Sequence, residues 1–153
     1  MIYSNYLYNN EAIGTVAIAS VLRHSKALTY AECLLVLPFL LHDDTLTFLS
    51  RSNFVFRSSE ELLIKKSSIL GNFNSRYTSL LPVSLNSLLI LNEMGVIEIN
   101  EKNISYTENN KFNLDTKSLG NRAGRIIKGA EKLNQLFELE KPSSLYLKLR
   151  IQL

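Results

Sequence analysis

Apolar residues recur at helical spacing through the first third of the chain. The segment Ala12–Leu22 has this spacing and predicts a first, largely buried helix. Thr29 precedes YAECLLVL as an N-cap and predicts a second helix, which Pro38 should kink or end because it supplies no backbone donor. In HDDTLTFLSR an acidic pair precedes the apolar residues, where free amides and the helix dipole favour carboxylates. The N-terminal part, 1–56, is therefore predicted to be helical.

The middle part, 57–110, contains the start and stop signals of several short elements. A capping-box pattern at Ser58 predicts a helix that ends at Gly71. FNSRYTSLL predicts a short helix ending before Pro82, and PVSLNSLLILNEM predicts a third helix from Pro82 to a C-cap at Gly95. Two β segments around the polar turn NEKN predict a hairpin. Three helices closed by a hairpin form the layout of a winged helix-turn-helix, so we expect a winged-helix-like centre.

The C-terminal part, 111–153, combines an amphipathic helix with an apolar tail. The helix is predicted over 119–138, with an inner seam at Leu119, Ala123, Ile126, Ala130, Leu133 and Phe137. The tail PSSLYLKLRIQL alternates apolar with more polar residues and predicts a strand, or a short helix followed by a strand. No repeat or Pro- and Gly-rich linker divides the chain. We therefore predict one domain, mainly α with a small β-hairpin, whose winged-helix-like centre is flanked by N- and C-terminal helices.

The charges of the predicted recognition helix argue against DNA reading. No Lys or Arg occurs from Tyr77 to Glu101, and three glutamates give this span a formal charge of −3. A reading helix contacts phosphates and base edges through Lys, Arg, Asn and Gln. Here the helix is apolar around nearly its full circumference, which is typical of burial on more than one side. We therefore expect protein contact, with candidate docking residues Leu85, Leu88, Leu89, Met94, Tyr146 and Leu147.

Basic residues gather further along the chain. From Lys111 to Lys132 there are six, against two acidic residues, a local formal charge of +4. The outer side of the amphipathic helix carries Arg122, Arg125, Lys128 and Lys132. This stripe is either a solvated face or a contact for a nucleic-acid backbone or an acidic partner, with affinity that falls as salt rises. Gly124 and Gly129 weaken the helix, which suggests the close approach of another backbone.

Composition limits the class of protein. Of the 153 residues, 46% are hydrophobic and 20% charged, as in globular chains, and the formal net charge is +3. Cys33 is the only cysteine, which excludes a disulfide scaffold and favours a reducing, cytoplasmic location. The N-terminus has no positive charge ahead of its apolar stretch, unlike a signal peptide. The apolar run from Cys33 to Leu41 has nine residues, whereas a membrane helix needs about 20, so we expect buried core and no membrane role.

Catalytic signals are weak. His42, Asp43 and Asp44 are consecutive, and adjacent side chains on a helix point in different directions, so they do not converge by adjacency. We interpret them as capping carboxylates and a histidine at a helix end, while a small enzyme using them stays the rival hypothesis. His24 is the one other histidine, which leaves no set of metal ligands at the usual spacing. Phosphate-loop, nucleophile-elbow and zinc-protease motifs do not occur.

Three stretches of the sequence together resemble a known family. They are CLLVLPFLLHDDT, FNSRYTSLLPVSLNSLLILNEMGVIEIN and AGRIIKGAEKLNQLFELEKPSSLYLKLRI, and they occur in the family's order over roughly residues 9–153. The chain is similar to the middle components of bacterial three-component ABC systems. That group includes the small third subunit of Lamassu anti-phage defence.

The resemblance implies a non-enzymatic adaptor that links an SMC/ABC-type ATPase to an effector, often a nuclease. ATP and Mg²⁺ would then belong to the ATPase, the subunit itself would need no cofactor, and contact with DNA would be indirect through the complex. The absence of a catalytic constellation and of positive charge on the predicted recognition helix agrees with this expectation. The alternative is a stand-alone winged-helix transcriptional regulator that binds DNA.

Overall fold

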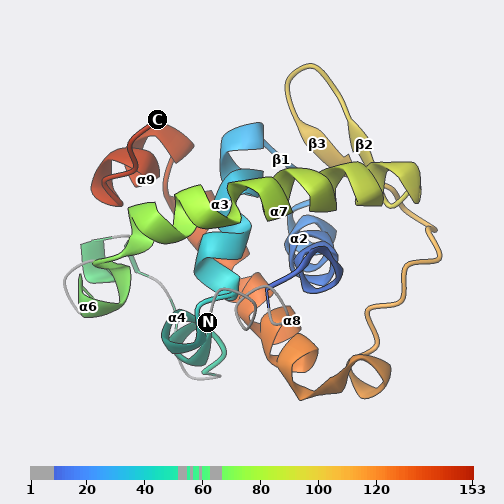
Figure 1. Ribbon diagram of the computed structural model, residues 1–153, viewed down its shortest axis with the longest axis horizontal. Helices are drawn as coiled ribbons and strands as arrows, with labels where there is room; N and C mark the ends of the chain where they lie inside the picture. Colours follow the sequence, from blue (N-terminus) through green and yellow to red (C-terminus); the bar gives the residue numbers. More distant parts are fainter. Residues whose placement is uncertain (1–8, 52–54, 56, 59, 63–66) are drawn as a thin grey trace.

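The computed structural model describes all residues except 1–8, 52–54, 56, 59 and 63–66. The fold is mainly helical with a small three-stranded antiparallel sheet, which confirms the predicted class (Figure 1). The elements are α2 (Glu11–Ser25), β1 (Ala27–Leu28), α3 (Tyr30–Leu40), α4 (Asp43–Leu49), α6 (Ser67–Leu70), α7 (Phe73–Glu93), β2 (Ile97–Ile99), β3 (Ile104–Tyr106), α8 (Thr116–Leu139) and α9 (Pro142–Lys148).

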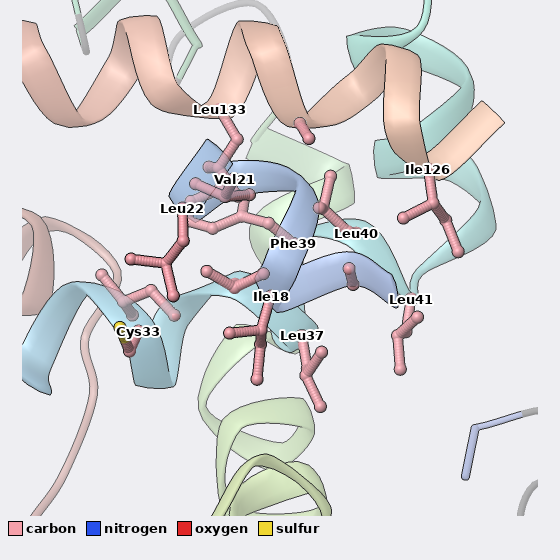
Figure 2. Close-up of a cluster of buried hydrophobic side chains, with 14 of the residues drawn as sticks. Ile18, Val21, Leu22, Cys33, Leu37, Phe39, Leu40, Leu41, Ile126 and Leu133 are labelled. Carbon is pink, nitrogen blue, oxygen red and sulfur yellow. The ribbon is translucent and has the colours of Figure 1, made fainter. Parts of the chain in front are cut away.

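Helix α2 lies inside the structure, as its apolar sequence predicts. It is buried continuously from Gly14 to Leu22 because α3, α7 and α8 all pack against it. Figure 2 shows side chains of α2, α3 and α8 meeting in one cluster, among them Ile18, Phe39 and Ile126. Each of these three side chains is fully buried. The apolar run of α3 is thus core, as its short length indicated.

The two ends of α3 are held differently. At the start, Thr29 and Glu32 form the capping box, because the Thr29 hydroxyl accepts from the Glu32 N–H at 3.2 Å and the Glu32 carboxylate accepts from the Thr29 N–H at 2.8 Å. At the other end, α3 continues to Leu40, so Pro38 does not end it. Arg76 of α7 donates from Nε to the Pro38 carbonyl at 3.3 Å. A side chain from another helix therefore satisfies one of the last carbonyls of α3.

Helix α7 is one helix, where the sequence predicted two. Pro82 lies inside it and removes one backbone hydrogen bond, at a local cost of about 3 kcal/mol. The helix nevertheless continues because its buried side chains lie on both sides of the proline and pack against α2 and α3: Phe73, Tyr77, Leu80, Val83, Leu88 and Leu91. Burying each such side chain stabilises by about 1.5–3 kcal/mol, so packing outweighs the local defect. The helix stops where the sequence predicted, because Met94 is its C-cap and Gly95 follows with φ +71°.

The predicted hairpin is present, and a third strand joins it. β2 and β3 pair antiparallel, and β1, only two residues long, pairs with the other side of β3. The turn of the hairpin is tied to α3 by the Tyr30 hydroxyl, which donates to the carbonyl of Asn100. The helices that pack together beside this sheet are α2, α3 and α7, and they extend well outside the range 57–110. The winged-helix-like centre predicted within 57–110 is thus not confirmed in that form.

Helix α8 is bent at Gly120, whose φ of +84° is not helical. The predicted seam is buried except for Leu119, which precedes the bend and is 36% exposed. Gly129 lies against α4: a β-carbon at this position would be 3.0 Å from Leu46 Cδ1 and 3.2 Å from Leu40 Cδ2. At Gly124 the nearest atom would be 3.8 Å away. The close neighbours of Gly129 are therefore side chains of α3 and α4, not the backbone that the sequence predicted, and Gly124 has no close neighbour.

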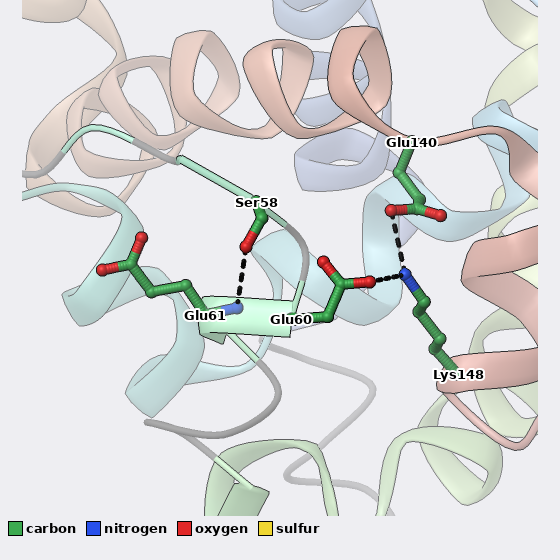
Figure 3. Close-up of polar contacts among 5 residues, drawn as sticks. All are labelled: Ser58, Glu60, Glu61, Glu140 and Lys148. Carbon is green, nitrogen blue, oxygen red and sulfur yellow. Dashed lines mark hydrogen bonds and ion pairs between the residues drawn. The ribbon is translucent and has the colours of Figure 1, made fainter.

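Helix α9 ends the described structure without a following strand, since residues 149–153 form none. Leu145 and Leu149 are buried on one side of it, as helical spacing requires. Figure 3 shows Lys148 between two carboxylates, and its Nζ lies 2.5 Å from Glu60 Oε1 and 3.0 Å from Glu140 Oε2. Lys148 thereby connects α9 to the end of α8 and to the segment after α4.

The helix predicted from Ser58 to Gly71 falls partly outside the described residues. Residues 59 and 63–66 of this helix lie outside the described residues, whereas residues 60–62 and α6 are helical as predicted. The capping interaction at its start is present, because Ser58 Oγ accepts from the Glu61 N–H at 3.3 Å (Figure 3). The Glu61 carboxylate accepts from the Arg57 N–H rather than from Ser58.

Candidate functional site

The HDD sequence builds the start of α4. His42 is its N-cap, with Nδ1 accepting from the Thr45 N–H at 3.4 Å and lying 2.8 Å from the Thr45 hydroxyl. Asp43 and Asp44 occupy the first turn, where the helix dipole favours negative charge. The sequence assigned the cap to the carboxylates, and the structure gives it to the histidine. His42 therefore has a structural role as the cap of α4, and the two aspartates lie in the first turn behind it.

The environments of Cys33 and His24 favour the neutral forms of both side chains. Burial raises the pKa of the Cys33 thiol, with a smaller contribution from Glu32, so the thiol is held in its neutral form. Burial lowers the pKa of His24, and Arg23 adds to this effect. Within the described part of the chain, no group of three or more His, Cys, Asp or Glu side chains is placed to hold a metal ion.

The second half of α7 presents an apolar surface that no other described element covers. Leu85 is 48% exposed, Leu89 58%, Ile90 40% and Met94 56%. We call these four residues the α7 stripe. Leu88 is only 5% exposed and belongs to the core, so this predicted docking residue is not part of the surface. Helical spacing placed Leu85, Leu89 and Met94 correctly on a helix, but only the packing of α2 shows which face stays open.

Polar and acidic side chains lie among and beside the residues of the α7 stripe. A cavity of about 370 Å³ is lined by Leu89 and Ile90 together with Glu11, Asn86 and Glu93. Asn86 donates to the Glu11 carboxylate at 3.0 Å and so holds the start of α2 beside the stripe. A surface that combines apolar side chains with carboxylates is complementary to a surface that combines apolar with basic side chains.

The two candidate docking residues of α9 have different environments. Tyr146 is partly buried, donates its hydroxyl to the Ala31 carbonyl at 2.8 Å and meets the Tyr77 ring edge-on at 5.6 Å. Its ring forms part of an apolar groove of about 460 Å³, lined by Ala31, Leu34, Tyr77, Pro142, Ser143, Tyr146 and Leu153. Leu147 is 80% exposed and points away from the core. Tyr146 and Leu147 therefore do not form a single surface together with the α7 stripe.

The four predicted basic residues of α8 fall into two pairs with different surroundings. Arg122 donates to the Asn9 side chain at 2.6 Å, and Arg125 donates to the Thr47 hydroxyl at 2.6 Å. Lys128 and Lys132 border a cleft whose other wall includes Arg51. Sequence analysis missed Arg51, because nothing in its own neighbourhood distinguishes it and only the packing of α4 on α8 places it there.

Comparison with known proteins identifies the family. The sequence model of ABC-three component (ABC-3C) system Middle Component 3 matches residues 4–153. The chain belongs to this family. No curated protein matches this middle component, and no solved structure matches it.

Family membership gives this middle component its general setting. It is one component of a multi-component ABC system and is expected beside the other components, such as an ATPase. No helix among the described residues has the length and apolar character needed to cross a membrane. Three described surfaces are candidates for contact with those components. They are the α7 stripe, the groove beside Tyr146 and the cleft at Arg51.

Proposed function

We propose that the chain is a non-enzymatic adaptor that holds an ATPase of the SMC/ABC type to an effector in a Lamassu-type anti-phage defence complex. The effector is proposed to be a nuclease, and ATP and Mg²⁺ to be bound by the ATPase. The family match supports a role as one component among several. His42, the base of the rival enzyme hypothesis, caps α4 through Thr45, which supports a structural role for this residue.

The observation that carries this proposal is the exposed α7 stripe. A small monomer rarely leaves several large apolar side chains exposed together on one helix, and such surfaces mark protein contacts. The stripe follows a rigid helix that is anchored in the core by Leu88 and Leu91, so it is held ready for a partner. We assign the stripe to the ATPase, whose matching surface would be apolar with basic residues facing Glu11 and Glu93.

The same surface makes the stand-alone regulator the weaker alternative. From Tyr77 to Glu101 the chain has no Lys or Arg, so α7 beyond its first turn carries no cation for phosphate contact, and Arg76 in that turn donates to the Pro38 carbonyl. If α2, α3, α7 and the hairpin are compared with a winged helix, the helix that would enter DNA is the one with the apolar stripe. This comparison favours protein contact over base readout.

Co-expression with the neighbouring ATPase and effector tests the proposal. The unmodified chain should co-purify with both, and Leu89→Asp with Met94→Asp should reduce recovery of the ATPase at least tenfold. Leu139→Asp is the matched control, because Leu139 is 50% exposed at the end of α8, away from the stripe. Docking through α7 would be contradicted if the control also lost the ATPase, or if the stripe variant recovered as much ATPase as the unmodified chain. If the unmodified chain captures neither protein, the adaptor function is wrong.

The rival enzyme hypothesis has its own test. A variant with His42→Asn, Asp43→Asn and Asp44→Asn keeps residues suited to a helix start and removes every titrating group of the HDD sequence. On the adaptor hypothesis this variant should still assemble and protect cells from phage. A complex that assembles normally but loses protection would support the enzyme instead.

A further inference from the structure

A basic cleft lies where the end of α4 meets α8. Its cavity of about 410 Å³ is lined by Leu49, Ser50, Arg51, Lys128, Glu131 and Lys132. Gly129 makes this meeting possible, since its missing side chain lets Leu46 and Leu49 of α4 lie directly on α8. The two lysines flank that contact on the surface of α8, and Arg51 follows the last turn of α4.

The charges in the cleft are unbalanced. Arg51, Lys128 and Lys132 face one carboxylate, that of Glu131, which gives a formal charge of +2. Among the described residues, none of these three cations has a side-chain hydrogen bond or an ion pair. The carboxylate of Glu131 also acts on His24, where it favours the protonated form. The cleft therefore has cationic groups that remain available to an anion from outside.

The cations form a row rather than a point. Arg125, Lys128 and Lys132 lie on one side of α8, and Arg125 keeps further N–H donors beyond the one that binds Thr47. Lys132 is seven positions after Arg125, which corresponds to about 10 Å along the helix because each residue adds about 1.5 Å. Cations spread over this length can contact more than one phosphate of the same backbone.

We propose that this cleft binds the phosphodiester backbone of nucleic acid, without reading its sequence. Arg51, Lys128 and Lys132 contact the phosphates, and Arg125 extends the row. An acidic protein segment is the less suitable occupant, because Leu49 is the only apolar side chain of the lining and is 1% exposed. Protein interfaces depend on apolar anchors, whereas nucleic-acid interfaces are polar and positively charged. This inference goes beyond the adaptor function and does not depend on it.

Fluorescence anisotropy with a labelled random-sequence duplex tests the cleft on the purified full chain. Binding should be detectable at 50 mM salt. With three phosphate contacts the logarithm of affinity falls by about 2.7 per tenfold rise in salt, so affinity should drop about 40-fold between 50 and 200 mM. A variant with Arg51→Gln, Lys128→Gln and Lys132→Gln should lose at least tenfold in affinity at 50 mM and show a flatter salt dependence.

A charge-matched control separates the cleft from net charge. Lys111→Gln, Lys117→Gln and Lys141→Gln remove three exposed cations elsewhere and lower the formal net charge from +3 to 0, as the cleft variant does. This control should keep its affinity within about threefold, and a Lys128→Arg, Lys132→Arg variant should bind like the unmodified chain. Circular dichroism confirms that each variant is folded.

Three results would overturn the proposal. They are no duplex binding at 50 mM salt, equal loss in the cleft variant and its matched control, or competition by poly-glutamate as strong as that by unlabelled DNA. The last result would assign the cleft to an acidic protein. None of these results affects co-purification with the ATPase and effector, so this site and the adaptor function can fail separately.

Discussion

Replacing Gly129 by alanine tests the packing on which the basic cleft depends. In a helix interior, Gly→Ala gains about 1 kcal/mol of stability from backbone propensity alone. At Gly129, however, the new methyl group would lie 3.0 Å and 3.2 Å from the side chains of Leu46 and Leu40, closer than ordinary contact. Both leucines are fully buried and cannot move into solvent. Overpacking of this kind costs about 1–3 kcal/mol, so the net change should lie between none and a loss of about 2 kcal/mol.

Gly124→Ala is the matched control in the same helix. A β-carbon at Gly124 meets nothing closer than 3.8 Å, so this variant should realise the propensity gain of up to about 1 kcal/mol. The two variants should therefore differ by about 1–3 kcal/mol, or about 3–9 °C in melting temperature for a domain of this size. Thermal and urea denaturation followed by circular dichroism measure the difference. If Gly129→Ala stabilises the protein as much as Gly124→Ala does, α4 does not pack on α8 as described.

Two further substitutions test contacts that join distant segments. The pKa of His42 is lowered, first by burial and then by Arg76, so the unfolded chain binds protons more readily. The free energy of unfolding should thus be full above the ordinary pKa of 6.5 and fall as the pH drops through the lowered pKa. His42→Asn should weaken this pH dependence in thermal melts between pH 7.5 and 5. The part of the dependence that comes from His24, whose pKa is also lowered, should remain. Arg76→Met removes the hydrogen bond to the Pro38 carbonyl and the contact in which the guanidinium lies 5.1 Å from the centre of the Phe73 ring. The free energy of unfolding, measured by urea denaturation, should fall by about 1–3 kcal/mol. An unchanged denaturation midpoint would show that α3 does not need this contact.

Several elements could be predicted because their determinants lie within a few residues of one another. The capping box of Thr29 and Glu32, the C-cap at Gly95 and the hairpin each depend on contacts between near neighbours in sequence. The seam of α8 from Ala123 to Phe137 was equally predictable, because helical spacing alone places those residues on one face.

The wrong predictions involve competition between local and distant effects. Pro82 is a strong local signal for a helix start, yet α7 continues through it because its buried face packs on α2 and α3. β1 has two residues and no pattern that would reveal it before β3 is in place. Leu88 differs from Leu85 and Leu89 only in the neighbour that covers it.

The sequence by itself determined the mainly helical class, the cap of α3, the hairpin and the family, since these follow from residue spacing and order. Only the tertiary structure decided which apolar residues remain exposed on α7 and which cations meet beside α8. The physical reason is that exposure and charge proximity depend on what packs against a residue, and Arg51 is brought beside Lys128 and Lys132 by a helix contact made at Gly129.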